Sequence, residues 1–502
     1  MKPQYKLGML ASYIGFAIST LSGFILPPLL IAHLGQELNG LYNALTGFSV
    51  YFGMMDLGLG TAIIRYVAKY RAEGEDEKIA EYLYVMRSLY FAICGITLFL
   101  GGIFTYFVPR IFAASIPAGY EGKARIVFFF SLQAIILTIF DNLYYSTIKA
   151  YEQFFISRSS AIMRVILRVV LIVLLLNLDC SVVAVAFADF LAIFLIMIYR
   201  MIFMKRRLKV QYRKPARGAI QLKEIFGFSA YVIVYSLTEK VFWQLDKVVL
   251  GIMAGGISVT IYTIGSQISS SISSVSSTVS SMYLPHAVKT STKGKEYTAV
   301  MAQMARFQLF VIIPVFLGFV FFGKDFLLLW VGDGYGESYR IALVLIVTLI
   351  PVLLQSYGEA LLKAINIQKV YASAMVVSVA ANILLTVLLI PRLGAYGAAL
   401  ASAIVNILRC VFMSFYYQKA LAIGIIPFLK LAFRGMPLCT CITAAAGLSL
   451  SRLLNAGGWL ELFAEICIFV AVYSACAFYY AFNDYELSMA KGIIKRFIRR
   501  KD

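Results

Sequence analysis

The stretch RSSAIMRVILRVVLIVLLLNLDCSVVAVAFADFLAIFLIMIYRMIF, residues 158–203, decides the fold class. It contains two apolar segments, 158–178 and 181–203, with only a few residues around Asp179 between them. A helix needs about 20 apolar residues to cross roughly 30 Å of hydrocarbon, so each segment is long enough for one crossing. Lipid offers no hydrogen bonds to open backbone groups, and each crossing is therefore expected to be a helix.

Segments of the same kind recur along the whole chain. The sequence is 61% hydrophobic and its mean hydropathy is +0.83. The connections between segments are too short to hold a soluble domain. The predicted fold class is an all-α membrane protein with about fourteen transmembrane helices. The expected spans are residues 7–32, 40–67, 82–108, 125–148, 158–178, 181–203, 225–253, 257–285, 298–323, 339–364, 369–390, 394–419, 427–452 and 459–482.

The net charge of +20 is better explained by orientation in a membrane than by binding to nucleic acid. Cytoplasmic loops of membrane proteins carry an excess of Lys and Arg. With both termini placed in the cytoplasm, only seven of the 45 Lys and Arg lie in or beside the predicted outer loops. This bias predicts cytoplasmic termini, and it would be lost if one span were removed. The seven are Arg110, Lys123, Arg125, Lys324, Arg340, Arg392 and Arg452.

The basic stretch KRRLKVQYRKPARGAIQLKE, residues 205–224, divides the first twelve spans into two sets of six. The two sets repeat weakly, because residues 41–69 align without gaps with residues 261–289. Two parallel lobes are therefore expected. The predicted parts are an N-lobe at 1–203, a cytoplasmic basic linker at 204–224, a C-lobe at 225–420, two further spans at 421–483 and a basic cytoplasmic tail at 484–502.

The sequence lacks the common motifs of enzymes and metal sites. The two histidines, His33 and His286, lie near span ends, and no H-E-x-x-H, G-x-S-x-G or Walker A motif occurs. We therefore expect no catalytic residue, no metal site, no cofactor and no hydrolysis of ATP. Uphill transport would then draw its energy from an H⁺ or Na⁺ gradient or from a coupled pathway.

Charged residues inside the spans are the candidates for function, because each costs about 2.5–3.5 kcal/mol at mid-membrane. Arg164 and Arg168 are one turn apart on one face of span five. Span seven carries two further stripes of charge at seven-residue spacing. The candidate cavity residues for an anionic cargo are Arg164, Arg168, Lys240, Lys247, Arg306 and Arg409. The candidates for ion coupling are Glu239, Asp246, Asp56 and Glu359.

Internal salt bridging is the alternative explanation for any one of these charges. Asp189 in span six, for example, could neutralise Arg168 in the neighbouring span. The whole set is harder to explain in this way. Several cations and acids within the spans together predict a polar interior, and hence a cavity or a pathway.

The chain resembles the Wzx-type polysaccharide flippases of the MOP superfamily, which also contains MATE drug exporters and lipid II flippases. The resemblance covers nearly the whole chain and rests on three loose motifs. They are DLGLGTAIIRYVAKY at 56–70, LDKVVLGIMAGGISVTIYTIG at 245–265 and LGAYGAALASAIVN at 393–406.

The resemblance implies a two-lobed, V-shaped helical bundle with a central cavity. It also implies that undecaprenyl-pyrophosphate-linked oligosaccharide is moved by alternating access from the inner to the outer leaflet of a bacterial cytoplasmic membrane, for the biosynthesis of surface polysaccharide such as O-antigen, capsule or exopolysaccharide. Membrane lipids and other polysaccharide-assembly proteins would be the partners of a monomer. A cationic cavity suits an anionic pyrophosphate. The alternatives are a MATE-like ion-coupled exporter, a lipid II flippase, or a membrane glycosyltransferase or polymerase. Membrane glycosyltransferases and polymerases usually need larger outer loops than this chain has.

The predicted topology can be tested by labelling single cysteines. In a cysteine-free background, Ala216→Cys and Gly334→Cys should react with an impermeant thiol reagent from opposite sides of the membrane, because the charge bias places residue 216 inside and residue 334 outside. Reaction of both cysteines with reagent added outside would contradict the fourteen-span arrangement.

Overall fold

The computed structural model describes residues 3–178, 181–214, 230–290, 295–365, 367, 369–453, 457–483 and 486–488. Within these residues the regular elements are all helical. The predicted all-α fold is therefore confirmed. Cα packing divides the chain into two compact units, Met1–Ile264 with Ala372–Ala398, and Gly265–Tyr371 with Ala399–Asp502. The predicted lobe boundaries differ from these units and stay a prediction.

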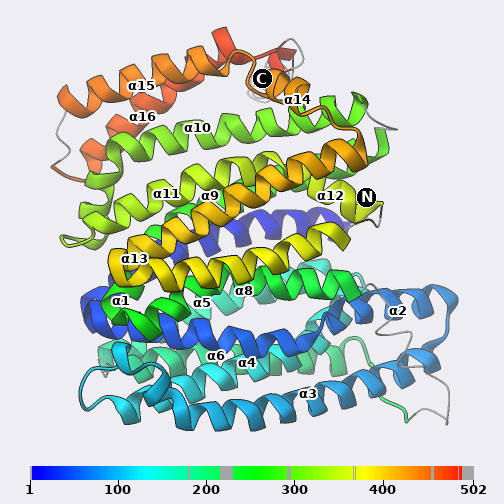
Figure 1. Ribbon diagram of the computed structural model, residues 1–502. Coiled ribbons are helices and arrows are strands. Elements are labelled where there is room, and N and C mark those ends of the chain that lie inside the picture. The colour runs from blue at the N-terminus through cyan, green and yellow to red at the C-terminus, as the bar shows by residue number, and fades with distance from the viewer. Residues whose placement is uncertain are drawn as a thin grey trace, which may run out of the picture. The chain divides into compact units, whose positions relative to one another are not determined.

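The first unit is built mainly from the N-terminal helices (Figure 1). Helix α4 packs along α3 and α6, and α1 packs along α5 and α8. Its elements are α1 (Pro3–Phe52), η1 (Gly53–Asp56), α2 (Leu59–Glu73), α3 (Asp76–Ile111), η2 (Ala113–Ser115), α4 (Glu121–Ala150), α5 (Phe154–Leu178), α6 (Val182–Arg206) and α8 (Ala230–Met253).

Helix α10 lies at the centre of packing in the second unit, because it contacts α11, α14, α15 and α16. The two C-terminal spans thus pack onto this helix. Helices α9 and α13 contribute to both units. Residues 255–264 of α9 and residues 372–398 of α13 belong to the first unit, and the rest of each helix belongs to the second. The remaining elements are α9 (Gly255–Thr290), α10 (Lys295–Val331), α11 (Gly336–Leu354), α12 (Ser356–Ala364), α13 (Lys369–Leu421), α14 (Ile425–Ala432), α15 (Met436–Leu453), α16 (Trp459–Cys476) and η3 (Ala477–Ala481).

Nine helices of the described residues are long and apolar enough to cross a membrane, and α14 with α15, bent by 45°, would make a tenth. Two of the nine, Ala11–Glu73 and Lys369–Leu421, are long enough for two crossings each. Each is interrupted by a glycine with positive φ, Gly35 at 73° and Gly394 at 55°. With α8 and α9, these helices account for the fourteen predicted spans.

Part of the predicted basic linker packs against the helices before it. The side chains of Leu208, Val210 and Tyr212 contact the hydrophobic cluster formed by α2, α3 and α4. The Arg213 backbone N–H donates to the Ala80 carbonyl at 3.2 Å, and Arg213 pairs with Glu77. The chain up to residue 214 is therefore attached to α3. Residues 215–229 lie outside the described residues.

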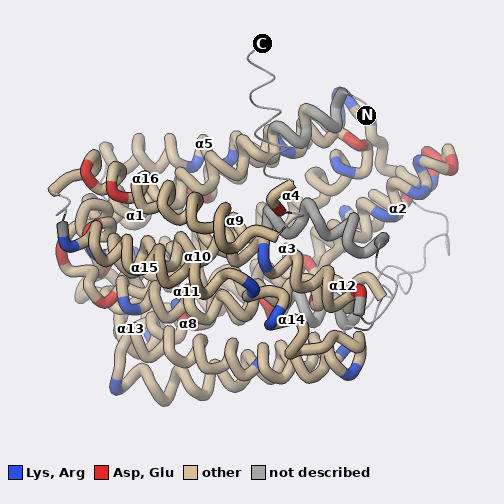
Figure 2. The backbone as a smooth tube through the Cα atoms, turned by 90° about the horizontal axis from the view of Figure 1, so that it is seen from above, with Lys and Arg blue, Asp and Glu red and all other residues tan. Residues whose placement is uncertain are grey.

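Charged side chains are unevenly distributed along the helices. Figure 2 shows Lys, Arg, Asp and Glu gathered on α2, whereas most of the tube carries neither sign of charge. The charge-poor stretches present large apolar side chains at their surface, such as Phe99 at 69% and Leu174 at 55% exposure. This is the pattern of helices that face lipid.

Glycines allow α1 to approach the start of α9 closely. A Cβ added to Gly40 would lie 1.7 Å from the Gly256 carbonyl oxygen, and one added to Gly256 would lie 2.4 Å from the Glu37 carbonyl oxygen. No other residue fits either position without moving the backbone. In membranes, such small residues let helix backbones pack by van der Waals contact.

We expect Gly40→Ala to lower the thermal stability of the detergent-solubilised protein, because overpacking against a backbone atom costs about 1–3 kcal/mol or more. Gly95→Ala is the matched control, since nothing lies within 4 Å of its added Cβ. The control should melt at or above the wild-type temperature, because Ala is the better helix former. Equal melting of both variants, measured by size-exclusion chromatography after heating, would contradict the close packing.

Candidate functional site

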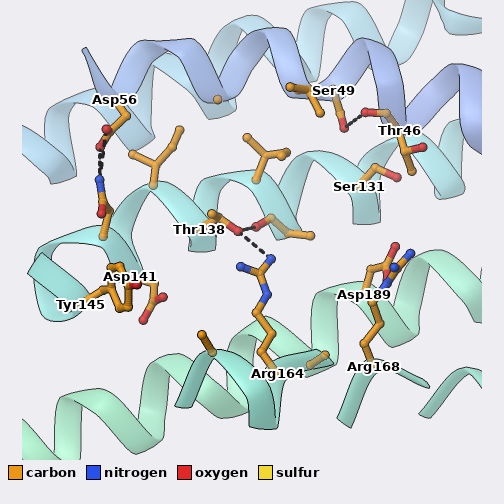
Figure 3. Close-up of a pocket in the computed structure, with 18 of the residues that line it drawn as sticks. Thr46, Ser49, Asp56, Ser131, Thr138, Asp141, Tyr145, Arg164, Arg168 and Asp189 are labelled. Atoms are coloured by element: carbon orange, nitrogen blue, oxygen red, sulfur yellow. Dashed lines mark hydrogen bonds and ion pairs between the residues drawn. The ribbon is translucent and has the colours of Figure 1, made fainter. Parts of the chain in front are cut away.

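A cavity of about 810 Å³, with charged and polar side chains among apolar ones in its wall, lies within the first unit. Its walls come from α1, η1, α4, α5, α6 and α8, and Figure 3 shows several of the side chains that line it. Its charged members are four cations and three acids. Its polar and charged residues are Thr46, Ser49, Asp56, Ser131, Thr138, Asp141, Asn142, Tyr145, Arg164, Arg168, Asp189, Arg200 and Lys240.

Helical periodicity explains why these side chains meet. Arg164 and Arg168 are four residues apart on α5 and both line the cavity, as their spacing predicts. On α4 the lining residues Thr138, Asp141 and Tyr145 recur every three or four residues. Helices α4 and α5 therefore each present polar side chains to the cavity along one face.

Arg168 is held by an internal network. Its Nε lies 2.5 Å from Asp189 Oδ1, and its Nη2 donates to the Tyr42 hydroxyl at 3.1 Å. Tyr42 in turn donates to Asp189 Oδ2. The salt bridge that the sequence left open as an alternative is thus formed, and it joins α5, α6 and α1.

Arg164 is differently placed. Its Nη2 donates to Thr138 Oγ1 at 3.3 Å, and Figure 3 shows the guanidinium pointing from α5 towards α4. The ion pairs found among the described residues do not include Arg164 or Lys240. Both side chains line the cavity. These two cations are therefore the cavity charges that no carboxylate compensates directly.

Arg200 was missed at the level of sequence. It is 4% exposed and pairs with Asp141. Its Nε donates to Ser160 Oγ at 3.0 Å, and its guanidinium lies 4.6 Å from the ring centre of Tyr145. A signal was present, since Arg200 follows Asp189 by eleven residues, which is three helical turns and places both on one face.

Asp56 lies where the second span is interrupted. Leu57 and Gly58 have positive φ angles of 47° and 72°, so the helix stops between η1 and α2. The carboxylate accepts hydrogen bonds from the Tyr90 hydroxyl at 2.9 Å and from Asn142 Nδ2 at 3.0 and 3.1 Å. Neutral donors therefore hold this acid at the edge of the cavity.

Asp246 occupies a second buried polar cluster of the first unit. It is 4% exposed and accepts a hydrogen bond from the Tyr262 hydroxyl. Asn382 Nδ2 and Thr386 Oγ1 lie at the longer distances of 3.4 and 3.5 Å from Asp246 Oδ1. Two helices, α9 and α13, thus place hydroxyl and amide groups around one buried carboxylate of α8.

Three other candidates lie outside these two clusters. Glu359 accepts a hydrogen bond from the Tyr371 hydroxyl at 2.9 Å, and Arg409 donates to Asn406 Oδ1 at 2.9 Å. Both belong to the second unit and line one small pocket there. Glu239, on α8, is half-buried. The side chain of Lys247, also on α8, is half-buried as well. The functions predicted for these four residues remain predictions.

Arg306 joins helices of the second unit. Its Nε and Nη2 donate to the two carboxylate oxygens of Glu486 at 2.7 and 2.8 Å. The remaining donors bind the carbonyl oxygens of Leu431, Arg434 and Ala481. A guanidinium has five N–H donors, and all five are used here. In this structure Arg306, which is 4% exposed, therefore offers no donor to a cargo.

The fold of this chain is similar to that of two solved membrane proteins. Over 94% of this chain and 98% of the other, the fold is similar to the lipid II flippase MurJ in an inward closed conformation, with a TM-score of 0.73 and 16% identity. An inward-facing multidrug resistance MATE family transporter of the MOP superfamily matches with a TM-score of 0.61 and 14% identity, over 81% of this chain and 94% of that one. The predicted MATE-like fold is therefore confirmed.

Sequence comparison identifies the family. The chain is 25% identical over 267 residues, or 51% of its length, to the probable low-salt glycan biosynthesis flippase Agl15 of Haloferax volcanii, of which it spans about half, 54%. The model of the family described as "Polysaccharide biosynthesis protein" matches residues 8–291. Since that match covers more than half of the chain, this multi-pass membrane protein belongs to the polysaccharide biosynthesis protein family, which confirms the resemblance noted from its motifs.

Proposed function

We propose that the protein flips undecaprenyl-pyrophosphate-linked oligosaccharide from the inner to the outer leaflet of a bacterial cytoplasmic membrane, for surface polysaccharide assembly. The proposal rests mainly on the position of Arg164. Its guanidinium lines a membrane-embedded cavity and forms no ion pair with a carboxylate among the described residues. The family match supports a role in glycan export over multidrug export. The alternative of a lipid II flippase rests on likeness of fold alone.

An anionic headgroup suits the charge balance of this cavity. Its four cations exceed its three acids by one, and two of the cations, Arg168 and Arg200, are already paired. Arg164 and Lys240 are left to attract a pyrophosphate. Arg is always protonated in proteins and binds phosphate oxygens through a planar fork, whereas Lys acts as a point charge. Alternating access would then expose this cavity first to the inner and later to the outer leaflet.

Ion coupling is proposed at Asp246. A buried carboxylate on α8 with hydroxyl and amide groups from α9 and α13 beside it can take up H⁺ or Na⁺. The hydroxyl oxygens of Tyr262 and Thr386 and the amide oxygen of Asn382 are the kind of ligand that a hard cation prefers. Helices α8 and α13 would then respond to the ion, since Asp246 belongs to the first and Asn382 to the second.

The proposed function also implies a membrane, an orientation and an oligomeric state for the protein. The uneven distribution of Lys and Arg between the predicted inner and outer loops supports cytoplasmic termini, and the cargo requires a membrane that holds lipid-linked oligosaccharide. A monomer would suffice, because the cavity is lined by one unit of one chain. Other membrane proteins of polysaccharide assembly would supply and consume the cargo.

Arg164→Ala should abolish surface polysaccharide in a flippase-null strain, because it removes the cavity's unpaired guanidinium. Arg164→Lys should retain part of the activity, since it keeps the charge and loses the fork. Surface polysaccharide is measured at matched membrane levels of each variant. Full complementation by Arg164→Ala would contradict the proposed headgroup site.

The matched control for Arg164 is the neighbouring pair. Arg168→Met with Asp189→Leu should fold, because the two changes remove both charges of the ion pair together. Asp189→Leu alone should destabilise the protein, since it leaves the charge of Arg168 within the membrane without its carboxylate partner. A double variant that folds but fails to complement would show that Arg168 also takes part in transport.

Asp246→Asn should uncouple transport from the ion gradient without loss of protein, because the amide keeps the size of the side chain and cannot be charged. The measurement is lipid-linked oligosaccharide transport in proteoliposomes with and without an imposed H⁺ or Na⁺ gradient. Glu239→Gln, on the same helix, provides the comparison. Gradient-driven transport that is unchanged in Asp246→Asn would exclude this site.

A further inference from the structure

Asp141 has one carboxylate oxygen that the fold leaves unused. Oδ2 is bound by Arg200, whereas Oδ1 is buried and has no hydrogen-bond partner among the described residues. The side chain is 3% exposed and belongs to the cavity wall. A buried acceptor without a partner costs about 1–3 kcal/mol, so it normally has a structural or functional reason.

Arg164 is placed to reach this oxygen. Its guanidinium already contacts α4 through Thr138, which precedes Asp141 by three residues. Residues three apart on a helix share a face and are separated by about 4.5 Å along its axis. Arg164 and Asp141 also line the same cavity. A change of side-chain rotamer is therefore the movement that an exchange between Thr138 and Asp141 Oδ1 requires of Arg164.

We propose that Asp141 is the exchange partner of Arg164: the guanidinium binds the anionic headgroup when cargo is present, and it moves to Asp141 Oδ1 to let the cargo leave. This inference rests on the proposed function. It makes Asp141 a positioning residue, because it acts on cargo only through Arg164.

Arg200 sets the strength of this exchange. It already neutralises Asp141 through Oδ2 and is fixed by Ser160 and the Tyr145 ring. Arg164 therefore meets a carboxylate whose charge is largely compensated, and its attraction to Asp141 is moderate. A headgroup with two phosphates can compete with such a partner, whereas a free carboxylate in a site of low dielectric would hold Arg164 tightly.

The Arg168 site shows the opposite arrangement. Both oxygens of Asp189 are used, one by Arg168 and the other by Tyr42. Neither oxygen of Asp189 lacks a donor, and Arg168 stays in its network. Arg168 is thus a fixed arginine and Arg164 an exchangeable one, and the two differ in whether the second oxygen of the partner carboxylate already has a donor.

The test measures binding of farnesyl pyrophosphate, a soluble isoprenyl pyrophosphate, to the purified full-length protein. Asp141→Asn should bind it roughly tenfold more tightly than wild type, the difference that about 1.4 kcal/mol produces, because the competing charge is gone. Asp141→Asn/Arg200→Gln guards against misfolding, since Arg200 is then not left as a buried cation without its carboxylate partner, and it should also bind more tightly than wild type. Glu121→Gln changes the charge of an exposed residue on the same helix and should bind as wild type does.

The decisive arm is a double-mutant cycle with Arg164→Ala. In that background, adding Asp141→Asn/Arg200→Gln should leave affinity unchanged, because the residue through which Asp141 acts is missing. A purely structural Asp141 would change melting temperature and leave affinity at the wild-type value, and that result would overturn the inference. If Arg164→Ala itself binds farnesyl pyrophosphate as wild type does, the proposed function fails instead, so the two failures are distinguishable.

Discussion

An unpaired charge is expensive within a bilayer, and the arrangement of α1, α4, α5 and α6 depends on how that cost is met. Asp141 and Arg200 pair across α4 and α6, while Arg168 and Asp189 pair across α5 and α6. Tyr42 brings α1 into the second network. These contacts can form only when the four helices are neighbours in one relative rotation, so they select that packing from the many that apolar surfaces alone would allow.

Close approach of the helices makes these pairs geometrically accessible. Lipid tails are as apolar as the side chains, so association within a membrane relies on van der Waals contact and hydrogen bonds. A Cβ on Gly60 would lie 2.5 Å from Asn142 Nδ2, and one on Gly101 would lie 2.4 Å from Leu132. The small residues on α2 and α3 therefore let α4 come near enough to present Asn142 to Asp56 and its other polar side chains to the cavity.

Arginine residues have different surroundings in the two units. In the second unit, Arg306 donates all five of its N–H groups to Glu486 and three carbonyl oxygens, and so connects the C-terminal helices to α10. In the first unit, Arg164 donates one hydrogen bond to a neutral hydroxyl. The two guanidinium groups thus differ in how many of their donors the fold already uses, and residue type alone does not reveal this difference.

The helical spans, the membrane setting and the common face of Arg164 and Arg168 followed from the sequence by itself, because crossing length, backbone hydrogen bonding and helical period are local properties. The partner of each charge was decided only by the tertiary structure. Arg200 and Asp141 are 59 residues apart in the chain, and no periodic pattern states that α4 and α6 are neighbours. For the same reason, the sequence grouped Arg306 with the cavity arginines, and only the packing of α10 against the C-terminal helices brought Glu486 to it.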